Sequence, residues 1–206
     1  MTGGALELQR VLVEADRAVR ARPFFARALR GRLSGAEYAE LIAQTLELLD
    51  SLGAPSVEAL SRAGRRDLVR LREASTAPEA PCPSARLLAC ARAGLDARDT
   101  PADLGQAGLA VVGTSWCADL AGALETPYPG RTGFLRRLRE EALRCAAALC
   151  AGLRAGTLDP RWTCASAELG RAALLGLAAH LELRWPEPLA HVQLTAKARS
   201  PRRRSS

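Results

Sequence analysis

The chain has 206 residues and a mass of 21.9 kDa, enough for one ordinary domain and too little for two domains with separate cores. Leu occurs 34 times, whereas Val and Ile together occur nine times. Because β-sheets favour β-branched residues, this bias argues against a large sheet and favours helices. Hydrophobic residues make up 48% of the chain, so it can bury a core. These numbers predict a single all-α domain.

The formal net charge of +7 is concentrated at one end of the chain. Residues 197–206 contain five of the 29 basic residues and no acid, so the rest carries 24 basic against 22 acidic residues. We therefore expect a helical domain over residues 1–190 and a basic, disordered tail over 191–206. With eight aromatic residues in all and no basic face interleaved with them, specific nucleic-acid binding is not expected.

Hydropathy and cysteine usage favour a soluble, cytoplasmic protein without membrane contact. No apolar run reaches the roughly 20 residues that a bilayer requires, and the segment after Met1 lacks an apolar signal core. The six cysteines form no Cys-x-x-Cys pair, so we expect reduced thiols that lie mostly in the core.

The first half of the chain predicts at least four helical segments. Leu, Ala and Val recur at helical spacing over residues 5–30. Ser34 and Glu37 have the spacing of a capping box, which opens a second helix that ends at Gly53. The next expected elements are helical pieces at 56–74, a proline-rich loop at 75–84 and a short helix at 84–96.

The second half predicts one central helix followed by two long ones. Pro101 is expected to open a helix over residues 101–125, which is apolar enough to be buried on all sides. Further helices are expected at 132–153 and 164–185, the last ending before Pro186. The predicted architecture is a single-domain bundle of six or more helices.

The spacing of residues 8–38 resembles the haem oxygenase family and its wider all-helical superfamily. In that family a Leu precedes the haem-ligating His by eight residues, and a Gly follows the His by fifteen. After this Gly comes Leu-Ser/Thr-x-x-x-Tyr. Leu8, Gly31 and the run from Leu33 to Tyr38 keep this spacing, and the His position falls on Asp16.

Two further blocks are similar to the family. The run Leu109–Ala118 resembles its distal helix, in which an apolar stretch leads into Gly-Ser/Asp-x-x-Gly-Gly over the haem face. The segment Thr132–Leu135 resembles the Gly-Phe that follows that helix. The resemblance implies the same fold and a haem or related tetrapyrrole bound between the first and the distal helix, with an electron donor as partner if the protein is catalytic.

The resemblance also implies the site residues. Thr114 takes the place of the distal polar residue that organises water for oxygen activation. The residues expected to contact the tetrapyrrole are Asp16, Gly113, Cys117, Ala118, Phe134, Arg144 and Arg154, the two arginines as substitutes for the family's propionate-binding residues. No residue is assigned to the iron, since a carboxylate is a poor substitute for the imidazole that the family uses.

Several of these residues have alternative interpretations. Asp16 is a solvent-facing helix residue, a polar group at a pocket mouth or a ligand. Cys117 either packs in the core or ligates iron as a thiolate. His180 lies on an apolar helix, where a hydrogen-bonded core position competes with a role as replacement ligand.

The resemblance, together with the residues that depart from it, implies three alternative functions. The first is a haem oxygenase-type protein that binds haem and, if active, cleaves it to biliverdin, CO and iron. The second is a non-catalytic descendant that binds another flat or amphipathic molecule or acts through protein contacts. The third is a di-iron oxidase, which is disfavoured because two His residues and no Glu-x-x-His pair cannot supply its ligands. No zinc-site spacing occurs either.

Overall fold

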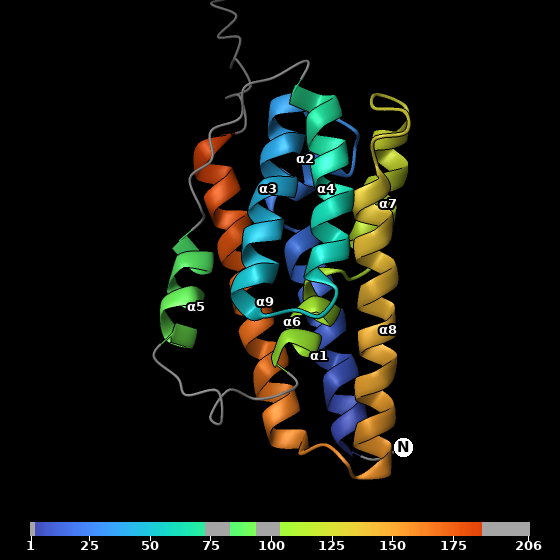
Figure 1. The fold of residues 1–206 in the computed structure, drawn as a ribbon, viewed down its shortest axis with the longest axis vertical. Coiled ribbons are helices and arrows are strands. Elements are labelled where there is room, and N and C mark those ends of the chain that lie inside the picture. Colours follow the sequence, from blue (N-terminus) through green and yellow to red (C-terminus); the bar gives the residue numbers. More distant parts are fainter. Residues whose placement is uncertain (1–2, 73–82, 94–103, 187–206) are drawn as a thin grey trace, which may run out of the picture.

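The protein is all-helical over the residues that its computed structural model describes, which are 3–72, 83–93 and 104–186 (Figure 1). No strand occurs within these ranges, which confirms the predicted all-α class. The helices are α1 (Gly3–Arg20), α2 (Pro23–Ala28), α3 (Gly35–Leu52), α4 (Val57–Arg72), α5 (Pro83–Ala93), α6 (Leu104–Val112), α7 (Trp116–Glu125), α8 (Gly133–Ala155) and α9 (Pro160–Arg184).

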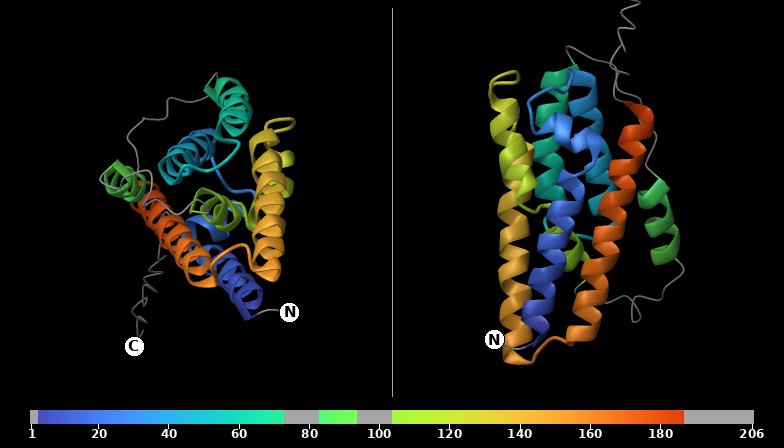
Figure 2. Two further views of the ribbon diagram at one scale, coloured as in Figure 1. Left: turned by 60° about the horizontal axis from the view of Figure 1, so that its bottom comes forward. Right: turned by 180° about the vertical axis from the view of Figure 1, so that it is seen from behind.

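The long helices α1, α3, α4, α8 and α9 run along one common axis, and α6 lies in the centre of the bundle (Figures 1 and 2). Every residue of α6 except Gln106 is buried, which confirms the prediction of a central apolar segment for this helix. Helix α5 lies on the outside of the bundle, against α3 and α9.

The local signals around the second helix are confirmed. The Ser34 hydroxyl accepts a hydrogen bond from the Glu37 backbone N–H at 3.2 Å, and the Ser34 N–H donates to the Glu37 carboxylate at 2.7 Å. The helix ends where Gly53 adopts a left-handed conformation with φ of 65°, which glycine reaches without steric cost.

The predicted helix over residues 5–30 is wrong as one element, because it is divided into α1 and α2. Arg22 is extended, with φ of −73° and ψ of 134°, and Pro23 opens α2. A proline disfavours the helical conformation of the residue before it and fits the first position of a new helix. The break at Pro23 therefore has a local cause.

The predicted helix over 101–125 is also divided, into α6 and α7, which are bent by 44° relative to each other. Helix α7 exposes Ala118 and Asp119, so only the α6 part is surrounded by protein. Pro101, most of the expected loop at 75–84 and the expected tail at 191–206 lie outside the described residues.

The last helix begins at Pro160, earlier than the predicted 164. The Asp159 side chain accepts a hydrogen bond from the Arg161 backbone N–H at 2.8 Å, and Pro160 occupies the first turn. An acidic cap followed by proline is a helix-start signal in its own right. The predicted end before Pro186 is confirmed.

Glycines allow α6 to lie close to its neighbours. A Cβ added to Gly105 would lie 2.1 Å from the backbone oxygen of Gly53, at the end of α3. A Cβ added to Gly170 on α9 would lie 3.0 Å from Cα of Gly108. The position of the central helix therefore depends on missing side chains as much as on apolar ones.

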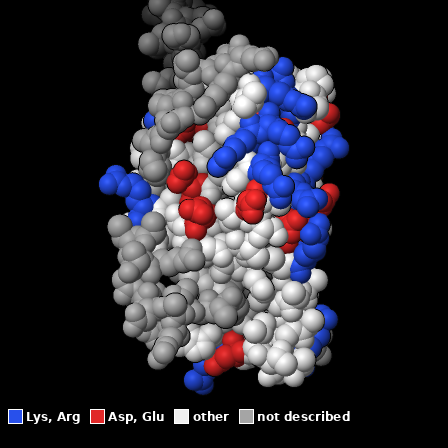
Figure 3. Space-filling model, in the orientation of Figure 1, with Lys and Arg blue, Asp and Glu red and all other residues white. Residues whose placement is uncertain are grey.

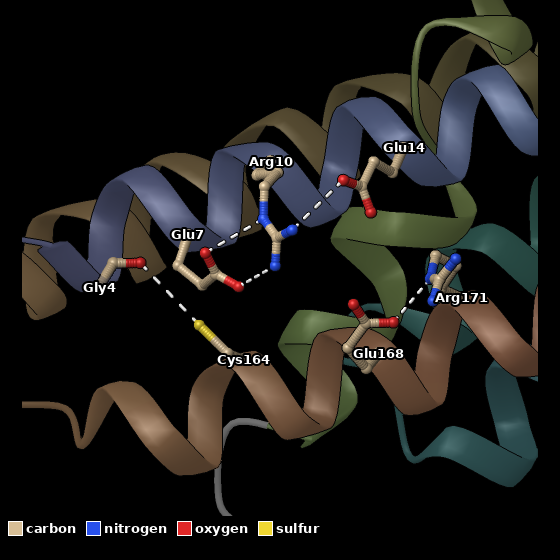
Figure 4. Close-up of polar contacts among 7 residues, drawn as sticks. All are labelled: Gly4, Glu7, Arg10, Glu14, Cys164, Glu168 and Arg171. Atoms are coloured by element: carbon tan, nitrogen blue, oxygen red, sulfur yellow. Dashed lines mark hydrogen bonds and ion pairs between the residues drawn. The ribbon is translucent and has the colours of Figure 1, made fainter.

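Helices α1 and α9 pack against each other along the side of the bundle, and their meeting edge carries charged side chains (Figure 4). At one end, a Cβ added to Gly4 would lie 2.7 Å from Cβ of Pro160. The ion pairs stay within each helix: Arg10 of α1 contacts Glu7 and Glu14, and Arg171 of α9 contacts Glu168. Exposed pairs within one helix contribute little to stability.

None of the described helices is by itself long and apolar enough to cross a membrane, and α6 with α7 passes on length and composition only as a bent pair.

The close approach of α6 to α3 makes a testable prediction. Gly105→Ala would force the new Cβ against the Gly53 carbonyl, so it should destabilise the protein by about 2 kcal/mol or more. The matched control is Gly122→Ala in α7, where nothing lies within 4 Å of the added Cβ and alanine should be neutral or stabilising by up to about 1 kcal/mol. Urea unfolding measures both, and equal effects would contradict the packing described here.

Candidate functional site

Asp16 on α1 lies directly beside the start of α7. One oxygen of its carboxylate accepts a hydrogen bond from the Trp116 backbone N–H at 2.9 Å. The other accepts from the Ser115 hydroxyl at 2.9 Å and from Nε of Arg20 at 2.6 Å. The structure therefore brings Asp16 to the block 113–118, the two segments that the sequence analysis placed on either side of a tetrapyrrole.

The Asp16 carboxylate acts as a cap for α7 that comes from another helix. Ser115 precedes α7 and makes no capping bond of its own to the first turn. The first N–H groups of a helix have no partner within the helix, and a negative charge at this end is favourable. Asp16 supplies both an acceptor and a charge at this place.

Arg20 connects the same groups from the next turn of α1. Its guanidinium contacts Asp16, donates to the Ser115 hydroxyl at 2.8 Å and pairs with Asp119 of α7 at 2.6 Å. The Ser115 hydroxyl can accept from Arg20 while it donates to Asp16. These four side chains form one network that joins α1 to α7.

The environment of Asp16 favours its ionised form. Burial raises the pKa of the carboxyl group, but the hydrogen bonds from Arg20, the Trp116 N–H and Ser115 together outweigh it and lower the pKa below its usual value. Asp16 is therefore a charged, fully engaged acceptor.

Residues next to this network along the chain are buried. Ala15 and Val19 of α1, and Val112 and Trp116 at the α6–α7 break, are fully buried. The Trp116 ring meets Phe25 of α2 edge to face, with centroids 4.9 Å apart, a favourable arrangement for aromatic rings.

The missing side chain of Gly113 makes room for α8. A Cβ at this position would lie 2.5 Å from Cβ of Ala142 and 2.8 Å from the backbone oxygen of Leu138. Arg139, also on α8, donates to the Gly113 carbonyl at 3.2 Å. Gly113 therefore allows the segment between α6 and α7 to pack closely against α8.

Cys117 is a core residue. It is fully buried, and its Sγ lies 3.8 Å from the backbone oxygen of Val112. Burial raises the pKa of the thiol well above its ordinary value, so the sulfur stays protonated and lacks the charge of a metal-binding thiolate.

Thr114 is also buried, and its hydroxyl makes no hydrogen bond to the described part of the chain. Within the described ranges, the indole N–H of Trp116 and Nε2 of His180 are also buried without a hydrogen-bond partner. Buried polar atoms without a partner are uncommon and mark places where water or a ligand binds.

Among the described residues, none of the other predicted site residues forms a hydrogen bond with Asp16. Phe134 is fully buried near the start of α8. Arg144 and Arg154 are exposed on the same helix, Arg144 in contact with Glu141. Ala118 is exposed and lines a shallow groove between α7 and α8. The predicted residues therefore do not gather around one cavity.

A metal site also finds no support in side-chain clustering. Within residues 3–72, 83–93 and 104–186, no group of three or more His, Cys, Asp and Glu side chains is placed to hold a metal ion.

Sequence reasoning missed a basic groove of about 700 Å³ between α4 and α8. Its charged lining is Arg62, Arg66, Arg70 and Arg137, with Asp67 among them. Figure 3 shows Lys and Arg side chains gathered over the upper part of this face. The spacing of four residues between the three α4 arginines was visible in the sequence, but the groove depends on how α4 packs against α8.

Comparison of the chain with protein-family models, curated proteins and solved structures found no match.

The Asp16 network makes a prediction about stability. Asp16→Ala removes the α7 cap and the Arg20 pair, so it should destabilise the protein by about 2 kcal/mol at pH 7. Glu14→Ala on the same helix removes only a 3.6 Å exposed contact with Arg10 and should change stability by less than about 0.5 kcal/mol. Equal losses in the two variants would contradict the capping role.

The lowered pKa of Asp16 adds a pH dependence. An acid whose pKa is lower in the folded state contributes stability above its unfolded pKa, near 3.9, and loses it as the pH falls through the folded value. The difference in unfolding free energy between wild type and Asp16→Asn should therefore be full at pH 7 and shrink below about pH 4. Urea unfolding between pH 7 and pH 3 measures this, and a constant difference would contradict it.

Proposed function

We propose that this chain is a non-catalytic protein of the haem oxygenase-like helical type, which neither holds nor opens a tetrapyrrole beside Asp16 and acts by binding another small molecule or a protein. The proposal rests on the hydrogen bonds that the Asp16 carboxylate already makes within the protein. This carboxylate is engaged by the Trp116 N–H, the Ser115 hydroxyl and the Arg20 guanidinium. The position that would hold an iron ligand instead fastens α1 to α7.

The chemistry of the nearby side chains supports this proposal. Haem iron takes a nitrogen or sulfur donor from the protein, whereas Asp16 offers oxygen atoms that are already bound to Arg20. Cys117 is the sulfur closest along the chain to the α6–α7 break, and burial keeps it protonated. These residues do not fit a haem iron, so no cleavage step is derived.

The packing between the helices supports it as well. A planar macrocycle needs an open slot, whereas Asp16 touches the start of α7 directly, through the Ser115 hydroxyl and the Trp116 N–H. Opening a slot there would break both hydrogen bonds and expose to water part of the apolar surface that Trp116 now buries.

A second candidate function is binding of haem or a related tetrapyrrole without cleavage. Its support is that α1 and the 113–118 block, the two segments that the resemblance puts around a tetrapyrrole, are neighbours, together with the buried Thr114 hydroxyl, which has no partner within the described residues. A tetrapyrrole at this place would have to displace the side chains that now pack there.

Haemin titration of the full chain tests the proposal. We expect no saturable Soret band and, on addition of a reductant and oxygen, no biliverdin. A Soret band with one haem per chain and no biliverdin would replace the proposal by the second candidate. Biliverdin production by the wild-type protein would overturn both.

The Asp16→His variant sharpens this experiment. Because histidine loses the charge that pairs with Arg20 and caps α7, we expect lower stability and no gain in haem affinity. Glu14→His, which puts an exposed imidazole two residues earlier on the same helix, controls for non-specific haem binding. A tenfold tighter haem affinity for Asp16→His alone would identify a ligand position and contradict the proposal.

A further inference from the structure

The groove between α4 and α8 carries a regular row of positive charges. Arg62, Arg66 and Arg70 follow each other at intervals of four residues and are exposed. Residues spaced in this way lie on one face of a helix, and eight residues span about 12 Å. Arg137 of α8 lines the opposite side.

No salt bridge within the described residues neutralises the row, although Asp67, which lines the same groove, lies within electrostatic reach of Arg66 and Arg70. Among the described residues, no Asp or Glu side chain forms an ion pair with Arg62, Arg66 or Arg70, whereas Arg10 on α1 pairs with two glutamates. Arg70 donates to the Gly130 carbonyl at 2.8 Å. Like charges one helical turn apart are unfavourable, so an anion in the groove would relieve their repulsion.

Arg137 and Asp67 limit where an anion can lie. Arg137 contacts Glu141 at 3.3 Å and Glu140 at 3.7 Å, so its charge is partly used. Asp67 is 4% exposed and accepts a hydrogen bond from the Phe134 backbone N–H at 2.8 Å. Asp67 therefore binds the start of α8 and offsets part of the charge of Arg66 and Arg70. Arg66 also donates from Nε to the Arg62 carbonyl at 3.3 Å. The guanidinium groups that form no ion pair within the described residues lie along the α4 side.

The remaining lining indicates the class of ligand. Between the charged residues the groove is lined by the small residues Ala59, Ala63, Gly130 and Gly133. Its described lining residues include no aromatic ring on which a base would stack and no large apolar side chain for an acyl chain or an amphipathic helix. Guanidinium groups bind phosphoryl oxygens in a two-pronged geometry, and about 700 Å³ is the size of a small-molecule site.

We propose that this groove binds a chain of two or more linked phosphoryl groups, laid along Arg62, Arg66 and Arg70. The source of that chain is either an inorganic oligophosphate or the phosphate tail of a small molecule. This site does not depend on Asp16 or on the α6–α7 break.

Calorimetric titration of the full chain at about 0.15 M salt tests the site. We expect tripolyphosphate to bind at one site per chain and at least tenfold more tightly than orthophosphate. The triple variant Arg62→Gln, Arg66→Gln, Arg70→Gln should bind tripolyphosphate at least tenfold more weakly. A control triple variant, Arg17→Gln, Arg86→Gln, Arg161→Gln, removes the same charge from exposed positions on α1, α5 and α9 and should bind as the wild type does.

The results of this titration distinguish a specific site from attraction by net charge and from no binding. An equal loss in both triple variants would show attraction by net charge alone, and no binding to the wild type would show no site; either overturns the proposal. A nucleoside triphosphate that binds as tightly as tripolyphosphate identifies a small-molecule tail as a source, and weaker binding identifies the inorganic chain. All six substituted arginines are exposed, so matching thermal unfolding curves should show that each variant is folded.

The haem experiment separates this inference from the proposed function. The Arg62/Arg66/Arg70 variant should give the same haemin titration as the wild type, because none of the three residues contacts the Asp16 network. Loss of tripolyphosphate binding with unchanged haem behaviour supports the groove alone, whereas a haem-binding wild type contradicts the proposed function alone.

Discussion

The arrangement around α7 depends on the hydrogen bonds and the ion pair that the Asp16 carboxylate makes. This carboxylate joins α1 to a helix start one hundred residues further along the chain, through a backbone N–H and a hydroxyl, and Arg20 ties the same groups together from the next turn. A charged acceptor at a helix N-terminus satisfies N–H groups that have no other partner. The break between α6 and α7 is therefore held in place by a side chain from outside both helices.

Close packing of the central helix reinforces this constraint. Gly105 fits against the end of α3, Gly108 meets Gly170 of α9, and Gly113 meets α8, so three neighbours approach α6 where side chains are missing. A helix surrounded in this way has little freedom to move aside for a planar ligand. By contrast, the arginine row on α4 faces a groove that is already open. The proposed binding site thus lies on the surface, whereas Asp16 has a structural role.

The features that could be predicted from the sequence were those set by residues close together in the chain. The Ser34–Glu37 capping box and the Gly53 cap involve residues within a few positions of each other, so their spacing was sufficient. Pro23 was a visible helix-break signal, but the apolar periodicity on either side of it led to the prediction of one continuous helix. The break at Gly113 could not be predicted, because the cap for α7 comes from Asp16. The resemblance predicted Asp16 on the far side of a tetrapyrrole from the 113–118 block, whereas Asp16 touches Ser115 directly. This contact depends on Arg20 and on the orientation of α7, which the sequence pattern does not fix.

The most direct test of the Asp16 network that joins α1 to α7 is a double-mutant cycle of Asp16→Ala and Ser115→Ala, measured by urea unfolding at pH 7. If the two side chains hold the helices together, the loss in the double variant should fall short of the summed single losses by about 1 kcal/mol. Additivity within about 0.3 kcal/mol would show that the 2.9 Å contact carries no coupling and would contradict the structural role of Asp16.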